Sequence, residues 1–598
     1  MNLTNRRFHL WDGVLIPLRY APVHMVLILL QRLISALLPA LNVGITASFV
    51  DTAILVGSGA EPLSAITVPL ILVIAVIAFQ RLSGSLINFV TIRAIFRLRE
   101  PMRRAFMEKR ARLSYEHIEN QKDWDLIART CGNPEDKIFD LYYTLTGTVS
   151  LVIQVVSVMA VLMAEIWWAG LVILAVSIPL TYISYKAGKK GYDADREVTN
   201  IDRRRDYLFD KLVCRETAAE RTMFGFTREL EPRYWEAFEK ARTTRLKVNL
   251  RYFVRVKAGG IASSLIAVAS AMVLAPAAVV GTISVGLFIS LLNALFSLSG
   301  SLSWGLANRM ESLAWSREYL KDLNTFASLS EQEGACSLPI AEEPFRRLEF
   351  RHVTFHYPGS DVTILKDLSF VIERGKHYSF VGINGAGKTT ITKLMTGLYP
   401  QYEGEILLND RELRTYSLTQ VKAYFCSVFQ DFARYALTFR ENISLGDTAA
   451  LETGPIPEER LDKAIELAGL TPAAENLPKG YDSPLGKLLE DGVDLSGGEW
   501  QRVAMARTIL SPAEVKILDE PTAALDPLAE SEVYENFQQI SEGKTTLFIS
   551  HRLGSTLLAD VIYVLDGGRM AECGSHQELM DKGGLYAAMF ESQRSWYQ

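Results

Sequence analysis

The stretch "GINGAGKTT", residues 382–390, decides the fold of the second half of the chain. It fits the spacing G-x-x-x-x-G-K-[ST] with Gly382, Gly387, Lys388 and Thr389. The strand-like run "HYSFV" precedes it and the helix-like run "TTITKLMTGL" follows it. The glycines let backbone N–H groups face a phosphate, Lys388 neutralises β- and γ-phosphates, and the Thr389 hydroxyl suits Mg²⁺. The stretch therefore predicts a phosphate-binding loop in an α/β domain.

A second motif, "VKILDEPTAALD", follows in the order that nucleotide hydrolysis requires. Asp519 ends a mostly apolar strand, where its carboxylate can reach Mg²⁺. Glu520 comes next and can polarise a water molecule for attack on the γ-phosphate. Lys516 interrupts the apolar run, which suggests that this strand has an exposed edge.

A third motif, "LSGGEWQR", residues 495–502, holds a serine followed by two glycines. Such a combination exposes backbone N–H groups and suits an anion, for which phosphate is the usual choice. One domain thus carries two phosphate-binding elements more than a hundred residues apart.

Composition places the other half of the chain in a membrane. The chain has 598 residues and a net charge of −5, which predicts several domains and excludes a nucleic-acid-binding surface as its main function. The mean hydropathy of +0.11 indicates membrane segments. The five cysteines are scattered without a CxxC pair, which is typical of reduced thiols on the cytoplasmic side.

Six apolar stretches before residue 310 are long enough to span a bilayer. We expect spans near 21–50 and 63–90, two more between 141 and 185 broken at "AEIWWAG", and two between 258 and 307 broken at "APAAVVGT". The short connections lack Lys and Arg, whereas residues 93–140 and 186–257 are rich in both. The positive-inside rule therefore predicts that both termini are cytoplasmic. The N-terminal 22 residues have the composition of an interfacial helix.

The charged stretches show helical spacing, so we expect the spans to continue as helices into the cytoplasm and to turn near 115–124 and 214–226. Arg32 and Arg81 lie inside predicted spans, each about 27 Å from the outer end at 1.5 Å per residue. Two interpretations stay open for them. They either face a central cavity and attract an anionic cargo, or they reach toward the inner headgroups or a polar neighbour.

The set of motifs resembles the ATP-binding cassette (ABC) family, and residues 345–592 look like its nucleotide-binding domain. "LSGGEWQR" matches the signature motif of that family. The resemblance implies that Tyr357 stacks on adenine, that Gln430 senses Mg²⁺ and water, and that His551 contacts the γ-phosphate. Asp526 would lie in the loop that crosses between two nucleotide sites.

The resemblance implies three sets of site residues. Those contacting ATP are Tyr357, Gly382, Asn384, Gly385, Gly387, Lys388, Thr389, Thr390, Ser496, Gly497, Gly498 and Asp526. Those around Mg²⁺ are Thr389, Gln430 and Asp519, and those in catalysis are Glu520, His551 and Gln430.

The chain departs from the family pattern in several places. Glu499 replaces the commoner Gln of the signature, and Ala523 replaces the usual Ser. The stretch "SPLGKLLEDG" matches only in part the charged loop typical of exporters, which weakens the inference about how the site communicates with the membrane helices. None of these departures removes a catalytic group.

The expected fold is a six-span helical bundle with long cytoplasmic extensions, joined to an α/β P-loop domain of ABC type. We expect a membrane domain over 1–325, a linker over 326–344 and a nucleotide-binding domain over 345–598. This arrangement resembles a half-transporter of the exporter fold. In that family each signature motif completes the ATP site of the other subunit, so the chain should pair with a second half-transporter. A homodimer is favoured because the chain carries both a catalytic set and a signature; a heterodimer stays open.

The expected function is ATP-driven transport across the cytoplasmic membrane by alternating access, with ATP and Mg²⁺ bound and export favoured. An importer of the same fold, carrying siderophore-like cargo, and a nucleotide-gated channel or regulator stay open as alternatives. The later spans mix polar and aromatic side chains, such as Asn293, Phe296 and Trp304. This mixture suits peptide, drug-like or lipid cargo equally. No N-terminal Cys/His peptidase pattern is present, so coupled leader cleavage is not expected.

Overall fold

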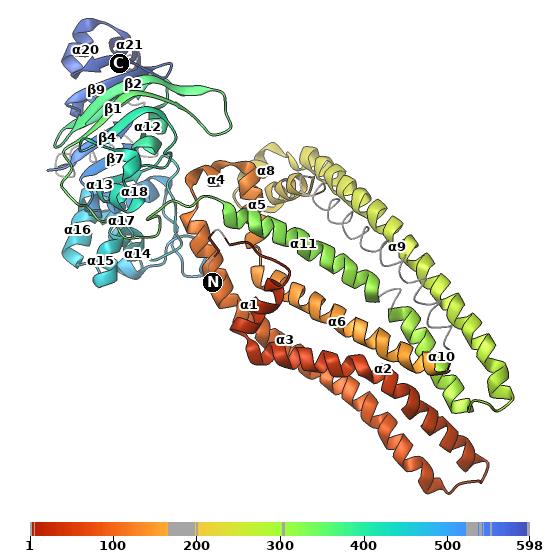
Figure 1. Cartoon of the computed structure of the whole chain (residues 1–598). Coiled ribbons are helices and arrows are strands. Elements are labelled where there is room, and N and C mark those ends of the chain that lie inside the picture. Colours follow the sequence, from red (N-terminus) through yellow and green to blue (C-terminus); the bar gives the residue numbers. More distant parts are fainter. Residues whose placement is uncertain are drawn as a thin grey trace. The chain divides into compact units, whose positions relative to one another are not determined.

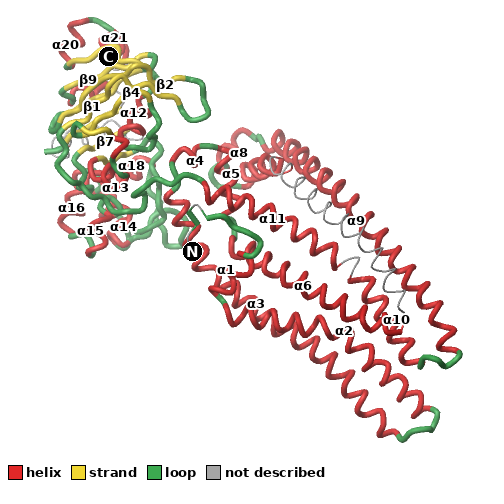
Figure 2. The backbone as a smooth tube through the Cα atoms, viewed as in Figure 1, coloured by secondary structure: helices red, strands yellow, loops and turns green. Residues whose placement is uncertain are grey.

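The structure is a computed structural model that describes residues 3–4, 6–165, 198, 201–301, 305–521, 536, 541, 543–549 and 553–594. Its contacts divide the chain into two compact units. The first comprises Met1–Met107 and Asp125–Ser328, and the second comprises Glu108–Trp124 and Leu329–Gln598. In the described residues the first unit is helical and the second combines helices with strands, as Figure 2 shows. The predicted fold classes of the two halves are thereby confirmed.

Helices make up the described part of the first unit, several of them more than 30 residues long (Figure 1). They are α1 (Asp12–Tyr20), α2 (Pro22–Gly57), α3 (Thr67–Arg112, which continues into the second unit), α5 (Gln121–Cys131), α6 (Pro134–Glu165), α8 (Ala218–Phe224), α9 (Thr227–Val279), α10 (Val285–Gly300) and α11 (Leu306–Ser328), with a 3₁₀ turn η1 (Leu63–Ile66). Helix α2 packs against α10 and α6, and α10 also packs against α9. Their shared core contains Val43, Val158, Leu162, Leu291 and Leu295.

Three of these helices, α2, α3 and α6, are long and apolar enough to cross a membrane, within the residues that the structure describes. Helix α2 continues to Gly57, beyond the predicted end of the first span. The predicted break at "APAAVVGT" is confirmed: α9 accommodates Pro276 and ends at Val279, within that stretch, and α10 begins at Val285. The predicted fourth span lies outside the described residues.

The segment Glu108–Trp124 belongs to the second unit. Helix α3 runs on to Arg112, as the spacing of its charged part predicted, and α4 (Tyr115–Glu119) follows it. Leu113 forms an isolated bridge with Glu331, and the Lys109 ammonium pairs with the Glu331 carboxylate at 2.6 Å. The predicted turn near 115–124 is therefore present as a short helix, held by the chain that follows α11.

Two sheets form the frame of the second unit. A four-stranded sheet has the order β2-β1-β4-β5, and a six-stranded sheet has the order β10-β9-β3-β8-β7-β6, among the strands that the structure describes. In the larger sheet β9, β3, β8, β7 and β6 run parallel. The strands are β1 (Arg347–His356), β2 (Thr363–Glu373), β3 (His377–Gly382), β4 (Glu403–Leu408), β5 (Arg411–Glu412), β6 (Phe425–Val428), β7 (Val515–Asp519), β8 (Thr545–Ile549), β9 (Val561–Asp566) and β10 (Arg569–Gly574).

Helices surround these sheets. They are α12 (Lys388–Met395), α13 (Leu418–Tyr424), α14 (Phe439–Ser444), α15 (Thr448–Thr453), α16 (Glu458–Leu467), α17 (Thr471–Glu475), α18 (Gly497–Leu510), α20 (His576–Lys582) and α21 (Leu585–Arg594), with 3₁₀ turns η3 (Leu413–Thr415), η4 (Gly480–Asp482) and η5 (Leu553–Leu558). Because parallel strands end at one edge, the loops after β3 and β7 meet there, and such edges bind ligands in α/β folds.

The expectation that Lys516 gives its strand an exposed edge is wrong. Strand β7 lies between β6 and β8, and Lys516 is buried. Its Nζ donates hydrogen bonds to the carbonyls of Thr508, Ile509 and Ser511, at the end of α18. Burial lowers the pKa of this ammonium to about 8. Lys516 therefore fits an internal strand, because its ammonium group donates hydrogen bonds to the free carbonyls at the C-terminal end of α18.

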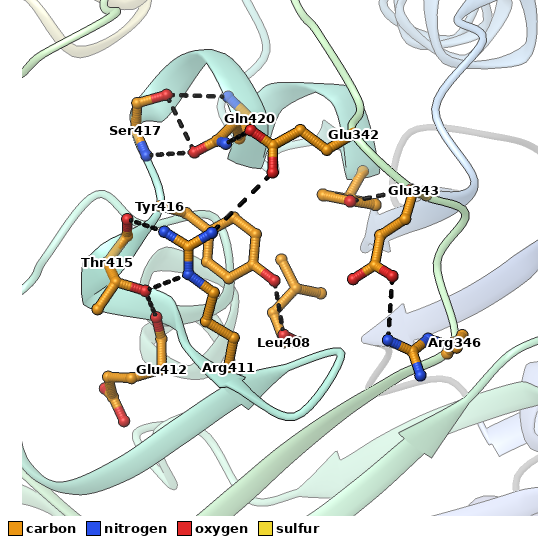
Figure 3. Close-up of polar contacts among 11 residues, drawn as sticks. Glu342, Glu343, Arg346, Leu408, Arg411, Glu412, Thr415, Tyr416, Ser417 and Gln420 are labelled. Atoms are coloured by element: carbon orange, nitrogen blue, oxygen red, sulfur yellow. Dashed lines mark hydrogen bonds and ion pairs between the residues drawn. The ribbon is translucent and has the colours of Figure 1, made fainter.

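The residues that precede β1 are tied to the second unit (Figure 3). The Gln420 side chain donates to the Glu342 carboxylate at 2.5 Å, and Arg346 pairs with Glu343 at 3.0 Å. Gln420 also closes a capping box with Ser417 at the start of α13. This part of the predicted linker thus contacts the domain that follows it.

Candidate functional site

The phosphate loop has the backbone that its glycines predicted. It leaves β3 at Gly382 and enters α12 at Lys388. Gly387 has a φ of 100°, and a Cβ there would lie 2.6 Å from a methyl carbon of Leu365. Lys388 Nζ donates to the carbonyls of Gly382 at 2.7 Å and Ile383 at 3.1 Å. The loop is therefore wrapped around an ammonium group that lies at the start of a helix.

The Lys388 ammonium is buried, which lowers its pKa, while the carboxylates of Glu520 and Asp519 act in the opposite direction. The phosphate loop and the loop after β7 are thus close enough to interact electrically. The sequence predicted that each loop adjoins a strand, and the structure brings the two loops together.

Asp519 has the features of a metal ligand. It is 1% exposed, and its Oδ2 has no hydrogen-bond partner among the described residues. Burial raises its pKa to about 6, against a hydrogen bond with Thr389 that lowers it. A buried carboxylate oxygen beside a threonine hydroxyl fits Mg²⁺, which prefers hard oxygens and takes its remaining ligands from water and phosphate. The described residues contain no cluster of three His, Cys, Asp or Glu side chains that would bind a metal alone.

Glu520 has a strained backbone. Its φ is 49°, in the left-handed region that non-glycine residues rarely adopt. Its N–H donates to the Ile549 carbonyl at 2.8 Å, and its carbonyl accepts from Gln501 Nε2 at 2.8 Å. Its carboxylate accepts from Gln430 Nε2 at 2.9 Å. Hydrogen bonds on both sides of the residue hold this conformation, and such strain is concentrated at functional sites.

Gln501 is a functional candidate that the sequence analysis missed. It lies on α18, five residues after Ser496, and is 3% exposed. Only the packing of α18 beside β7 brings its amide to the Glu520 carbonyl, so no local pattern reveals the contact. The helix that carries the signature motif thereby also positions the candidate base of its own chain.

The signature motif forms the start of α18. Ser496 is the N-cap, and its hydroxyl accepts from the Glu499 N–H at 3.2 Å. The Glu499 carboxylate in return accepts from the Ser496 N–H at 2.7 Å. This capping box explains why an acidic residue is tolerated where the family has Gln. Gly497 and Gly498 form the first turn, whose N–H groups point toward the helix start.

Tyr357, the residue expected to stack on adenine, lies beside the phosphate-loop helix. Its hydroxyl is 3.0 Å from the Thr390 hydroxyl, which belongs to the phosphate-loop helix. Its ring packs edge-on against Phe355 and Tyr399. An open cavity of about 540 Å³ unites these groups, and its lining residues are Tyr357, Ile364, Asn384, Gly385, Gly387, Lys388, Thr389, Thr390, Gln430, Glu520 and Ile549.

Helix α4 contacts the residues next to this cavity. Lys393, on α12, pairs through Nζ with Glu119 at 2.6 Å and lies 5.3 Å from the centre of the Tyr357 ring. The Glu119 carboxylate also accepts a hydrogen bond from the Tyr399 hydroxyl, and the Tyr115 ring packs edge-on against Tyr399. Burial opposes the ionisation of Glu119, but the hydrogen bonds from Lys393 and Tyr399 hold its pKa below the usual value.

Two predicted site residues, Asp526 and His551, lie outside the described residues. Of the others, Tyr357, Lys388, Gln430 and Glu520 line one cavity. The signature serine and glycines, on the contrary, are not among the residues that line it.

Comparisons with known proteins agree with this arrangement. A family model described as ABC transporter matches residues 365–523. The subtilin transport ATP-binding protein SpaT of Bacillus subtilis is 29% identical over 496 residues, which cover 81% of this chain and 78% of that protein. The ATP-dependent lipid A-core flippase of Bordetella avium (strain 197N) is 30% identical over 461 residues, which cover 75% of this chain and 74% of that protein.

A solved structure, of a bacterial Atm1-family ABC exporter with ATP bound, has the same fold. The TM-score is 0.77 at 24% sequence identity, over 94% of this chain and 98% of that chain. The likeness extends over both halves, so the helical half is arranged as in an exporter. With its phosphate loop, its Asp519–Glu520 pair and its signature helix, the chain belongs to the ABC transporter family, as an ATPase coupled to transport.

Proposed function

We propose that the protein is a homodimeric half-transporter that exports an amphipathic lipid or peptide from the cytoplasmic side of the cell membrane by alternating access. Its membrane domain would cover 1–325 with six spans and both termini in the cytoplasm, its linker 326–344, and its nucleotide-binding domain 345–598. The names of two relatives, a subtilin transporter and a lipid A-core flippase, favour peptide or lipid as the class of cargo.

The observation that carries this proposal is the convergence of Lys388, Gln430 and Glu520 on one cavity. ATP would stack its base on Tyr357 and place its phosphates on the loop around Lys388. Glu520, held by Gln430 and Gln501, would take the proton of the attacking water. Thr389, Asp519 and Gln430 would hold Mg²⁺, whose charge offsets that of the phosphates when it is bound. His551 and Asp526 would complete the site.

The signature helix supports a dimer. Ser496, Gly497 and Gly498 form a helix start that is suited to an anion, and they are not part of the wall of their own chain's ATP cavity. We therefore assign them to the γ-phosphate bound by the other subunit. The Glu499 carboxylate lies at the same helix start, and it would oppose the phosphate charge more than a Gln does.

The variant Glu520→Gln in proteoliposomes tests the proposal. ATP should bind with unchanged affinity, while hydrolysis and ATP-dependent cargo movement should fall by about a hundredfold or more, because the base is lost. Glu475→Gln, an exposed glutamate at the end of α17, is the matched control and should behave as the parent chain. Unchanged hydrolysis by Glu520→Gln would overturn the assignment. Ion current that persists without hydrolysis would favour a channel over a pump.

A further inference from the structure

We propose that Arg32 and Arg309 form a binding site for the phosphate or carboxylate headgroup of an amphiphilic cargo. This inference rests on the proposed transport function and names the chemical class of what is carried. Arg32 is on α2 and Arg309 on α11, and both side chains meet at one point on α6, all within the first unit.

The two guanidinium groups converge on one residue, Tyr143. Arg32 Nη1 donates to the Tyr143 carbonyl at 2.6 Å and to the Thr146 hydroxyl at 3.0 Å. Arg309 Nη1 donates to the same carbonyl at 3.4 Å. Their Cζ atoms lie 3.5 Å and 5.2 Å from the centre of the Tyr143 ring. Two cations from different helices are thus held side by side.

A glycine makes this convergence sterically possible. A Cβ at Gly147 would lie 2.5 Å from Arg309 Cζ and 2.7 Å from Arg32 Nη1. Any side chain there would displace both guanidinium groups. The small residue, the threonine hydroxyl and the two arginines together form one cluster rather than two isolated surface charges.

Arg32 and Arg309 place two positive charges in this cluster. Within the described residues, neither arginine forms an ion pair with a carboxylate. Arg32 is 8% exposed, and no charged residue occurs in residues 141–164 of α6. Two like charges repel each other, and burying them in an apolar bundle costs free energy. A bound anion between them would offset both the repulsion and the cost of burial. A planar guanidinium matches the paired oxygens of a phosphate or carboxylate.

The position along α6 indicates a headgroup. Tyr143 follows Asp140, the last charged residue before the apolar run, by three positions. The cluster therefore lies near the boundary of the apolar stretch, where a headgroup resides and from which an acyl or other apolar tail can extend along the bundle. Arg81, the other arginine predicted inside a span, is exposed on α3 and takes no part in the cluster.

Lysophosphatidic acid and lysophosphatidylcholine with the same acyl chain are the probes. The first has an anionic phosphate monoester as headgroup, whereas the second has a phosphocholine headgroup without net charge. Equilibrium binding to the full chain in phosphatidylcholine nanodiscs should favour lysophosphatidic acid. In Arg32→Gln/Arg309→Gln its affinity should fall about tenfold or more, the expected loss for charge-assisted hydrogen bonds, with lysophosphatidylcholine unchanged. Arg81→Gln is the matched control and should stay within about twofold of the parent chain.

Two further variants keep the test decisive if the double variant does not fold. Arg309→Gln alters only a half-exposed side chain, and Gly147→Ala keeps both charges but displaces them. Each should weaken the binding of lysophosphatidic acid selectively. Equal binding of the two lipids by the parent chain, equal loss in Arg81→Gln, or unchanged binding in the arginine variants would overturn the proposal.

Inorganic phosphate is the remaining arm, and it separates a free anion from a headgroup. If inorganic phosphate displaces lysophosphatidic acid only at concentrations far above that of the lysolipid, the site binds an amphiphile. If phosphate displaces it at equal concentrations, the assignment to cargo is overturned. ATP hydrolysis by the parent chain and by Glu520→Gln in the same nanodiscs reports separately on the proposed transport function. If the parent chain binds the two lysolipids equally but hydrolyses ATP normally, this inference alone is rejected.

Discussion

The pair formed by Glu119 and Lys393 is the contact that we expect to hold α4 against α12. Its charged atoms are 2.6 Å apart, so Coulomb's law gives about 1.6 kcal/mol at a dielectric constant of about 80 and about 6 kcal/mol at about 20. The Glu119 side chain is 37% exposed, so solvent screens the attraction toward the lower limit. We therefore expect a coupling of about 1 kcal/mol, or about fivefold in an equilibrium constant.

Amide hydrogen exchange of α4 in the full chain measures this coupling. Glu119→Gln and Lys393→Met should each accelerate exchange at residues 115–119 about fivefold, because either change lowers the free energy of local opening. The double variant should exchange no faster than either single variant. Lys122→Met, an exposed neighbour on α5, is the control and should leave the rates unchanged.

If exchange in the double variant were about 25-fold faster than in the parent chain, the effects of the two single variants would multiply. The two side chains would then act independently, which would refute the reasoning. Single variants with less than a twofold effect would refute it as well.

Two more predictions concern the loop after β7. Gln501→Leu should lower kcat about tenfold and leave the Kd for ATP unchanged, because it removes the hydrogen bond to the Glu520 carbonyl but no ATP contact. A steady-state ATPase assay measures kcat, and a nucleotide-binding assay measures Kd. Asp519→Asn should raise the thermal unfolding midpoint of the protein free of nucleotide and Mg²⁺ at pH 7.5. The pKa of Asp519 in the folded protein, about 6, lies above the ordinary value of 3.8. Ionisation of Asp519 therefore lowers the free energy of unfolding increasingly between pH 4 and pH 6. The loss reaches about 3 kcal/mol and stays constant above pH 6. The gain should be about half as large at pH 5, and an equal gain at both pH values would contradict the assigned cause.

Local sequence patterns predicted the parts of the site that depend on local geometry. The glycines around Lys388 fix the backbone of the loop, and Asp519 and Glu520 follow a strand whose end faces the same edge. The helical spacing after residue 93 predicted the extension of α3 for the same reason. These features need no knowledge of which elements become neighbours.

Contacts between distant elements could not be predicted. A charged residue in an apolar strand suggests exposure, but the carbonyls at the end of α18 accept hydrogen bonds from the buried Lys516 ammonium. Glu119 and Lys393 are separated by 274 positions and Gln501 and Glu520 by 19, and neither pair has a local signature. The sequence shows Arg32 as a charge within a predicted span, but its proximity to Arg309 depends on the packing of α2 and α11 on α6.

The central claim is that each ATP site combines the phosphate loop of one subunit with the signature helix of the other. Dimers of two covalently linked chains can carry Lys388→Ala and Gly498→Asp either in the same chain or in opposite chains. With the lesions in opposite chains one complete site survives, and with both in the same chain neither does. We predict that ATP hydrolysis is retained in part only when the lesions are in opposite chains. Hydrolysis retained only when both lesions are in the same chain would contradict the claim, because the signature would then serve its own chain's ATP.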